Sequence, residues 1–415
     1  MPECIVIGGG AAGMMAAGTA AQTGIDTAIV EKNTMLGRKL RITGKGRCNV
    51  TNIADMETMM QQIPGNAKFL YSAFRNFTNE DTIAFFEQWG VPLKTERGGR
   101  VFPQSDKAID IVNALIRFCR ENGVKSLQAQ VAEVMVTEGQ VRGVRLQSGK
   151  AIACRSVILA TGGKSYPRTG STGDGYRMAQ QLGHHIVPPR ASLVPVEIKE
   201  TWVHALQGLS LKNVRLSLYE DSRKIWEEQG ELLFTHFGLS GPLVLSASCH
   251  MRGIPDKAYE LRIDLKPALS EQVLQERLLR DFETYANKDI VNYLPTLVPH
   301  KLVEYLLRQS GLEAHTKVHQ IRRQQRQNMV HALKEMCVPV SGLRPIEEAI
   351  ITAGGVSTKE VNPSTMESKR VRGLYFAGEV LDVDAYTGGY NLQIAFSTGV
   401  LAGLQKGQDQ AKVGK

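Results

Sequence analysis

Residues 4–13, CIVIGGGAAG, carry the pattern that decides the fold. The apolar run 4–7 predicts a short buried strand, and a glycine-rich turn follows it at once. An alanine- and methionine-rich helix is expected to continue to about Gly24, and 26–30 predicts a second strand that ends at Glu31. This order of strand, GxGxxG turn, helix, strand and acid is typical of a dinucleotide-binding fold.

Each glycine of the turn has a physical role in such a fold. Gly8 permits the tight turn, Gly10 lets the backbone approach a pyrophosphate, and Gly13 lets the helix pack on the strand. The helix N-terminus supplies free N–H groups and a partial positive charge for the phosphates. Glu31 would accept hydrogen bonds from the hydroxyls of a ribose.

Composition indicates a globular protein with a sizeable core. The chain has 415 residues, of which 42% are hydrophobic and 22% charged, and at ~150 residues per domain this predicts two or three domains. No apolar run approaches the ~18 to 20 residues of a membrane span. The opening segment lacks the basic start of a secretion signal, since its first positive charge is Lys32. We therefore expect a cytoplasmic protein without a membrane partner.

Cysteine usage and charge narrow the choice of chemistry. The six cysteines are scattered and form no CxxC pair, which argues against zinc sites and thioredoxin-type redox pairs and fits a reduced cytoplasm. We predict no metal site. The net charge of +9 favours anionic partners such as cofactor phosphates, acidic substrates or nucleic acid, with a solvated basic surface as the alternative.

Changes in pattern along the chain predict a discontinuous nucleotide-binding domain with an insert. Its first part is expected over 1–190 and includes a β-meander at 131–163, where turn signals separate three strand-like runs. A β-rich, barrel-like segment is expected over 191–268, and helical periodicity predicts a helical insert over 269–340. The glycine-rich, apolar style of the N-terminus returns in 341–415, the second part of the nucleotide-binding domain.

A second strand-and-glycine pattern lies in this last segment. Residues 374–379, LYFAGE, predict a strand that ends in glycine and acid, and Asp382 follows. GGYN at 388–391 then opens an apolar helix. A flavin needs such a pair, because an acid can contact ribityl or ribose hydroxyls and a helix N-terminus can offset negative charge on the reduced ring. A routine C-terminal strand–helix unit is the alternative.

These motifs together resemble a known family. GRK at 37–39, TGKGRCNVTN at 43–52, FTHFGLSGP at 234–242 and GEVLD…GGYN at 378–391, with the glycine fingerprint, are similar to the BaiN/RdsA-type FAD-dependent oxidoreductases. The resemblance covers nearly the whole chain. It implies an α/β fold: a Rossmann-like FAD-binding domain of the two-dinucleotide-binding type, with an inserted β-barrel and a small helical domain.

In that family the loop over 38–47 wraps the flavin. Here it carries five positive charges and no acid, so contact with the pyrophosphate or the ring is expected, and a basic surface loop is the alternative. Cys48 has no partner cysteine five residues on, where Ile53 stands, so disulfide-exchange chemistry is disfavoured. The residues that we predict to bind FAD are Gly8, Gly10, Ala11, Ala12, Gly13, Glu31, Lys32, Arg38, Lys39, Arg47, Cys48, Asn49, Val131, Thr161, Gly162, Gly378, Glu379, Asp382, Gly389, Asn391 and Leu392.

Three side chains are candidates for catalysis. His236 lies between an apolar strand and a glycine-rich turn, and could donate a proton to substrate; a structural histidine is the alternative. Tyr386 and Tyr390 flank the glycine pair before the last helix and are proton donors or ring-stacking walls, with ordinary packing as the alternative. The chain has no second GxGxxG, so NAD(P)H is expected to dock transiently as the electron source.

Family members include a bile-acid enone reductase, a ribosomal-RNA dihydrouridine synthase and an aminoacetone oxidase. We expect this chain to match the first, reducing a C=C bond conjugated to a carbonyl in a steroidal enone such as a 3-dehydro-bile acid. Dihydrouridine synthesis in 23S ribosomal RNA and amine oxidation are the alternative activities, and a non-enzymatic FAD-binding scaffold is the weakest hypothesis. RNA is the weaker choice of partner because 270–338 holds ten basic and eight acidic residues, which is too balanced for a strong electrostatic footprint. The sequence does not specify the oligomeric state.

Overall fold

The computed structural model describes residues 1–413 and contains two compact units. The first consists of Met1–Ser192 together with the chain from Ile346 onward, and the second is Leu193–Pro345. Each unit has its own apolar core. The first unit is therefore built from both ends of the sequence.

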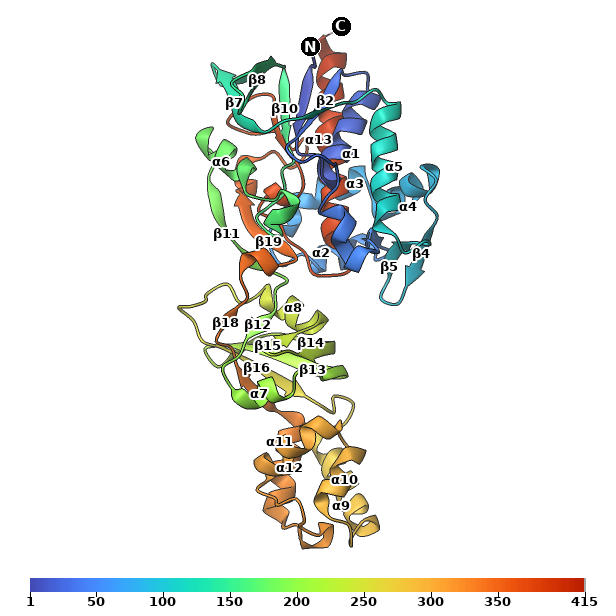
Figure 1. The fold of residues 1–415 in the computed structure, drawn as a ribbon, viewed down its shortest axis with the longest axis vertical. Coiled ribbons are helices and arrows are strands. Elements are labelled where there is room, and N and C mark those ends of the chain that lie inside the picture. Colours follow the sequence, from blue (N-terminus) through green and yellow to red (C-terminus); the bar gives the residue numbers. More distant parts are fainter. Residues whose placement is uncertain (414–415) are drawn as a thin grey trace. The chain divides into compact units, whose positions relative to one another are not determined.

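A five-stranded parallel sheet is the centre of the first unit (Figure 1). Its strands, in spatial order, are β6 (Lys125–Gln128), β2 (Thr27–Glu31), β1 (Cys4–Ile7), β10 (Ser156–Leu159) and β20 (Leu374–Phe376). All four pairings are parallel. Strands β2 and β6 lie on one side of β1, and β10 and β20 lie on the other, so the strand order changes direction between β1 and β10. In open α/β sheets, ligands bind outside the carboxyl ends of strands at such a point.

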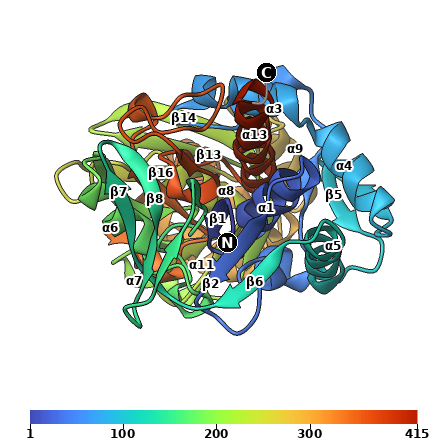
Figure 2. The same ribbon diagram turned by 90° about the horizontal axis from the view of Figure 1, so that it is seen from above.

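Helix α1 (Ala11–Gln22) is enclosed on several sides, which explains its alanine, glycine and methionine content. A Cβ at Gly18 would lie 2.2 Å from the ring of Phe118 on helix α5 (Ala108–Glu121). On another side, α1 packs along helix α13 (Tyr390–Val413), as both views show (Figures 1 and 2). A Cβ at Gly399 would lie 2.6 Å from the Ala12 carbonyl oxygen, and one at Gly403 would lie 2.7 Å from that of Ala16. The two helices therefore run parallel and pack backbone to backbone.

Smaller elements complete the first unit. Its other strands are β3 (Thr51–Asn52), β4 (Leu93–Glu96), β5 (Arg100–Pro103), β7 (Val131–Thr137), β8 (Gln140–Leu146), β9 (Ala151–Ala153), β11 (Ile186–Ser192) and β19 (Ile351–Val356). Its other α-helices are α2 (Met56–Gln61), α3 (Tyr71–Asn76), α4 (Asn79–Gln88) and α6 (Asp174–Gln181). Strands β7, β8 and β9 form an antiparallel meander. The run 151–160, expected as one meander strand, is instead two strands, because the chain leaves the meander after Ala153 and joins the parallel sheet at Ser156.

The second unit combines an antiparallel sheet with helices. The spatial order is β17 (Met336–Pro339), β16 (Tyr259–Asp264), β13 (Ser210–Glu220), β14 (Arg223–Phe234), β15 (Gly238–Ser240), β12 (Val196–Glu197) and β18 (Gly342–Leu343). The first and last strands of this order are separated in the chain only by Val340 and Ser341. The run 336–343 thus pairs with both edges, which curls the sheet into a barrel-like form.

The helices of the second unit lie mostly between β16 and β17 in the sequence. They are α7 (Thr201–Ala205), α8 (Pro242–Ser248), α9 (Glu271–Thr284), α10 (Ile290–Tyr293), α11 (Val303–Ser310) and α12 (Arg323–Lys334). A domain boundary was expected at residue 340, but the strand run 336–343 spans that position. The sequence did not reveal this run, because strands of four and two residues carry little periodicity. Among the described residues, no helix is long and apolar enough to cross a bilayer.

The close packing of α1 and α13 gives a stability prediction with an unusual sign. On an exposed helix, glycine to alanine raises the free energy of unfolding by ~1 kcal/mol. We expect Gly403→Ala to lower it by ~1 to 3 kcal/mol, because the added methyl overpacks a tight contact. Urea denaturation measures the change. The control is Ala84→Gly on the exposed face of α4, which should follow propensity and cost about 1 kcal/mol; a stabilised Gly403→Ala variant would show that the contact is loose.

Candidate functional site

The glycine-rich turn lies at the carboxyl ends of β1 and β10. Gly8 has φ +103°, and a Cβ there would lie 2.5 Å from the Ala160 carbonyl oxygen; a Cβ at Gly13 would lie 1.9 Å from the Gly8 oxygen. Glycine is required at both positions, because neighbouring backbone atoms lie too close for a side chain. Gly10 differs, because a Cβ there would meet no atom within 4 Å. Its backbone borders open space at the N-terminus of α1, where Ala11 and Ala12 begin the helix.

Glu31, the last residue of β2, fastens this turn. Its Oε2 accepts a hydrogen bond from the Gly9 amide (2.7 Å), and its Oε1 accepts from the backbone and side-chain amides of Asn33 (2.8 and 2.7 Å). A carboxylate has about four lone-pair sites, so capacity for a ribose hydroxyl remains. The first turn of α1 contains no acid, and its partial positive charge is not neutralised from within the helix.

Two predicted cofactor-binding residues hold buried polar atoms without a partner. Thr161, which follows β10, and Asn49 have buried side-chain oxygens, Oγ1 and Oδ1, that make no hydrogen bond among the described residues. Buried polar groups in proteins are normally satisfied. Together with the open space at Gly10, these two unpartnered oxygens fit a site that the hydrogen-bonding groups of a ligand such as FAD would complete.

Lys39 and Glu379, predicted separately as cofactor contacts, form an ion pair with each other. Lys39 Nζ lies 2.7 Å from Glu379 Oε2 and donates to Ser165 Oγ (2.6 Å). Glu379 Oε1 accepts from the Thr352 amide (2.9 Å) and from Ser165 Oγ (3.0 Å). We call Lys39, Ser165, Thr352 and Glu379 the Lys39 cluster. Ser165 and Thr352 were not predicted, because single buried hydroxyls carry no sequence signal.

Gly378, the residue before Glu379, brings the cluster to α1. Its φ is +74°, and a Cβ there would lie 2.8 Å from the Ala12 Cβ. Gly162, after Thr161, also has a left-handed φ of +72°. The chain thus turns sharply at the carboxyl ends of both β10 and β20, where glycine tolerates the conformation.

Other predicted basic contacts have protein partners. Arg47 pairs with Glu96 and with Asp106 (2.6 Å) and lies 4.3 Å over the Phe102 ring. A hydrogen bond from Arg47 lowers the pKa of Glu96, hydrogen bonds from Lys94 and then Arg47 lower the pKa of Asp106, and the two acids raise the pKa of Arg47. Two further predicted basic residues also have partners. Lys32 forms an ion pair with Asp174 at 2.7 Å, and Arg38 donates a hydrogen bond to Asn33 Oδ1 at 3.0 Å.

The loop of the GRCNVTN motif has a strained backbone. Lys45 and Cys48 have φ of 58° and 62°, values that non-glycine residues seldom adopt and that cluster at functional sites. Cys48 is fully buried, and desolvation raises the pKa of its thiol to about 12. Arg41, on the same loop, has a buried Nε without a partner among the described residues. The buried thiol fits a packing role for Cys48.

The N-terminus of α13 is fixed to this motif. A Cβ at Gly389 would lie 2.3 Å from the Thr51 carbonyl oxygen. Asn391 bonds the loop before the helix, through the Ala385 amide and carbonyl (2.9 and 2.7 Å). Buried Gln393 accepts from Thr51 Oγ1 at 2.6 Å and from Thr82 Oγ1 at 2.9 Å. Gln393 was not among the predicted residues, although a polar side chain within an apolar helix is a recognisable sign of a buried hydrogen-bonding role.

The other predicted contacts lie in varied surroundings. Asp382 Oδ2 accepts from Asn66 Nδ2 (2.9 Å). Leu392 is half-buried on α13, and Val131 is buried at the start of β7. Of these three positions, only Asp382 has a polar side chain.

The three catalytic candidates are divided between the two units. His236 is an exposed residue of the turn after β14 in the second unit, with its ring centroid 5.0 Å from that of Phe237. Tyr386 and Tyr390 belong to the first unit; Tyr386 is half-buried in the loop that Asn391 holds, and Tyr390 is the buried first residue of α13. Among the described residues, no group of three or more His, Cys, Asp or Glu could hold a metal ion.

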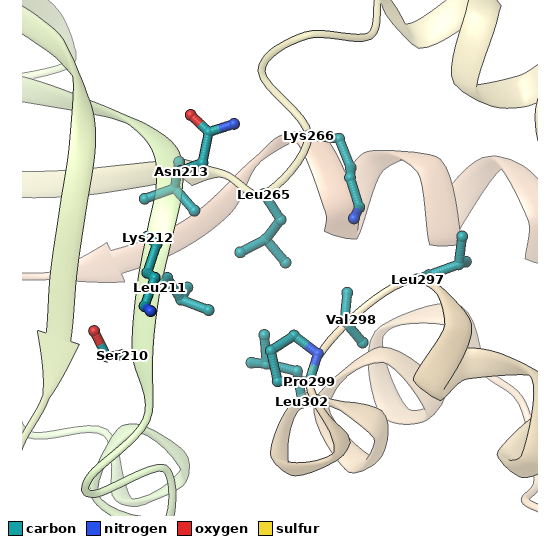
Figure 3. Close-up of a pocket in the computed structure, with 11 residues that line it drawn as sticks. Ser210, Leu211, Lys212, Asn213, Leu265, Lys266, Leu297, Val298, Pro299 and Leu302 are labelled. Atoms are coloured by element: carbon teal, nitrogen blue, oxygen red, sulfur yellow. The ribbon is translucent and has the colours of Figure 1, made fainter.

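A cavity of about 190 Å³ lies in the second unit (Figure 3). Apolar side chains such as Leu211, Leu265 and Leu302 line it, with Lys212 and Lys266 on opposite sides. Burial lowers the pKa of Lys266. None of the predicted cofactor-binding or catalytic residues lines this cavity, so it is separate from the site at the sheet edge.

The model of the HI0933-like protein Rossmann domain matches residues 2–405. The chain belongs to this family. A ribosomal RNA dihydrouridine synthase from Haemophilus influenzae is 34% identical over 407 residues, 97% of this chain and 98% of that protein. A 3-dehydro-bile acid delta(4,6)-reductase from Clostridium scindens is 31% identical over 403 residues, 96% of this chain and 97% of that protein. The predicted family is confirmed, and the finding supports a FAD-type oxidoreductase.

Two further comparisons agree. A ribosomal RNA dihydrouridine synthase from Escherichia coli K12 is 33% identical over 95% of this chain and 96% of its own. The structure of a 3-ketosteroid delta1-dehydrogenase from Sterolibacterium denitrificans is similar with a TM-score of 0.50 at 13% identity, covering 98% of this chain and 99% of that one. That likeness concerns the fold alone, and the predicted α/β Rossmann fold is confirmed.

The bonds of Glu31 give a prediction for cofactor retention. Glu31→Ala removes the anchor of the turn and any bond to the ribose, so we expect FAD affinity to fall roughly 10- to 100-fold, the equivalent of a lost charge-assisted bond of ~1.5 to 3 kcal/mol. Flavin fluorescence during apoprotein titration measures the affinity. Exposed Glu121→Ala should retain wild-type affinity. Equal affinity for Glu31→Ala and wild type would remove Glu31 from the site.

Thiol exposure gives a second prediction. Cys337 is exposed, whereas the other five cysteines are buried, and burial raises the pKa of Cys48 to about 12. Since the thiolate is the reactive form, a colorimetric thiol reagent at about pH 8 should titrate one fast thiol in the native protein and six after denaturation. The fast thiol should vanish in Cys337→Ser and persist in Cys48→Ser. Rapid loss of a thiol in wild type that is absent from Cys48→Ser would contradict the packing role.

Proposed function

We propose that the protein is a FAD-dependent reductase of a carbon–carbon double bond conjugated to a carbonyl. The observation that carries the proposal is the whole-chain relationship to two reductive activities, at 34% and 31% identity. A uracil ring and a steroidal enone differ in size but share this electronic feature. Hydride addition to either builds negative charge on the carbonyl oxygen and leaves a carbon to be protonated.

Different groups of this chain would bind the different parts of the cofactor. The N-terminal amides of α1 would bind the pyrophosphate, and Glu31 would bind the adenosine ribose. The N-terminus of α13, fastened to the motif by Gly389, would offset negative charge at the flavin ring. The chemistry that FAD supplies when bound is hydride transfer, with NAD(P)H as the electron source.

The proton must come from a protein group or from water. We assign it to His236, with Tyr386 and Tyr390 as the other candidates. Removal of a positioned proton donor typically slows a reaction ~10²- to 10⁴-fold.

We propose a small hydrophobic enone of the steroidal type as the substrate, because three residues whose backbones adjoin the Lys39 cluster have exposed apolar side chains: Ile42, Tyr166 and Ile350 are 47%, 36% and 41% exposed. The second candidate is a uridine of ribosomal RNA, which the two dihydrouridine synthase relatives favour. These candidates are separable, because RNA binding falls steeply with salt.

The test is anaerobic reduction of the FAD-loaded protein followed by a substrate panel. We expect reoxidation by a steroidal 4-en-3-one and none by a saturated ketone. Reoxidation by ribosomal RNA alone, weakened by salt, would assign the second candidate. Reoxidation by neither class would exclude the proposed reaction. In the same assay His236→Ala should slow reoxidation ~10²- to 10⁴-fold while FAD content and reduction stay intact; an unchanged rate removes His236.

A further inference from the structure

Tyr166 has an unusual backbone for an aromatic residue. It lies on the loop between β10 and α6, with φ 52° and ψ 58°. Bulky residues in the left-handed region are conformational outliers, and the following residue, Pro167, restricts the preceding backbone further. Such strain persists only where the surrounding structure imposes it.

The neighbouring residue imposes it here. Ser165 is fully buried, and its Oγ bonds Lys39 Nζ and Glu379 Oε1. Its amide donates to Thr352 Oγ1 (3.0 Å), as does the Lys164 amide (2.8 Å). After Tyr166, the Thr169 amide and hydroxyl both donate to its carbonyl (2.8 and 2.7 Å). Both sides of Tyr166 are therefore fixed, and its side chain cannot relax by moving the loop.

The side chain of Tyr166 is only partly covered by its surroundings. It is 36% exposed, and among the described residues its ring makes no aromatic or cation–π contact and its hydroxyl no hydrogen bond. The stability of the fold does not explain a partly exposed amphipathic ring on a strained backbone. Strain of this kind is concentrated at ligand-binding positions.

Two other exposed apolar side chains stand beside the same cluster. Ile350 precedes β19, and its carbonyl oxygen lies 3.5 Å from Ser165 Oγ; Ile42 donates its amide to the Lys39 carbonyl. They are 41% and 47% exposed. Exposed apolar groups that gather at one place mark binding surfaces, and the backbones of all three residues meet the Lys39 cluster.

We propose that Tyr166 contacts the substrate, stacking its ring on the planar conjugated carbonyl system while Ile42 and Ile350 bound the apolar face. This inference rests on the proposed function and names the residue that selects a flat, unsaturated substrate. The shared chemistry is a planar α,β-unsaturated carbonyl, present both in a free enone and in the uracil ring of RNA. Offset stacking of aromatic rings on planar groups is favourable in this geometry.

The experiment compares Tyr166→Asn with Tyr166→Phe in the FAD-loaded enzyme. Asparagine tolerates the left-handed backbone but lacks the ring, whereas phenylalanine keeps the ring. Binding is followed by the change in the visible flavin spectrum on titration with a steroidal 4-en-3-one, and separately with a uridine-containing RNA. Anaerobic reoxidation is measured on the same samples.

We expect Tyr166→Asn to raise the dissociation constant about tenfold, with unchanged FAD content and an equal or higher melting temperature because strain is relieved. Tyr166→Phe should lose no more than about threefold. The matched control is Tyr71→Asn, a half-exposed tyrosine outside the Lys39 cluster, which should leave binding unchanged. The arm that shows the effect, enone or RNA, identifies the source of the planar carbonyl.

An unchanged dissociation constant in Tyr166→Asn overturns the inference, as does a wild-type enzyme that binds neither probe. A loss in Tyr166→Phe equal to that in Tyr166→Asn also overturns it, since the ring would then be irrelevant. Wild-type protein that binds a probe through Tyr166 but is never reoxidised by it contradicts the proposed function while supporting the inference.

Discussion

The close approach of helix α1 to its surroundings is the constraint on which the rest of the first unit depends. Gly13 places the helix against the turn at Gly8, and that turn lies against the Ala160 carbonyl. On another side, Gly399 and Gly403 bring α13 to backbone contact with α1. Since any side chain would separate these elements, the glycines fix where both helices begin. Both N-termini consequently face the carboxyl edge of the sheet, the edge at which a nucleotide binds.

Hydrogen bonding distinguishes the residues that hold this edge in shape from two buried oxygens that have no partner within the described part of the chain. Gln393 has its amide oxygen bonded to Thr51 and Thr82 and its nitrogen to Ser397 Oγ (2.9 Å). The Lys39–Glu379 pair is likewise satisfied from several directions. Satisfied buried networks specify one arrangement, so these residues hold the edge in shape. Thr161 and Asn49 are the contrast, because their buried oxygens lack a partner among the described residues.

The sequence predicted most where local rules decide the structure. The strand–turn–helix unit at 4–31 follows from steric limits on glycine and from hydrophobic periodicity, and the family motifs extended the prediction to the whole chain. It predicted less where distant residues meet. Lys39 and Glu379 were each assigned to the cofactor, yet they lie 340 residues apart in sequence and pair with each other. Tyr166 gave no signal, because its strain arises from bonds that its neighbours make to β19 and to the Lys39 cluster.

The two helix N-termini do not lie level with each other. Gly399, nine residues into α13, meets Ala12, the second residue of α1. The offset is about eight residues, so at about 1.5 Å per residue α13 begins roughly 12 Å farther out from the sheet than α1. The GRCNVTN motif meets α13 at that outer end, through Thr51. An elongated dinucleotide suits this offset, since its phosphates would lie at α1 and its ring at α13. In the proposed arrangement, the GRCNVTN motif would therefore lie beside the reacting end of the cofactor, and the glycine fingerprint would bind the phosphate end.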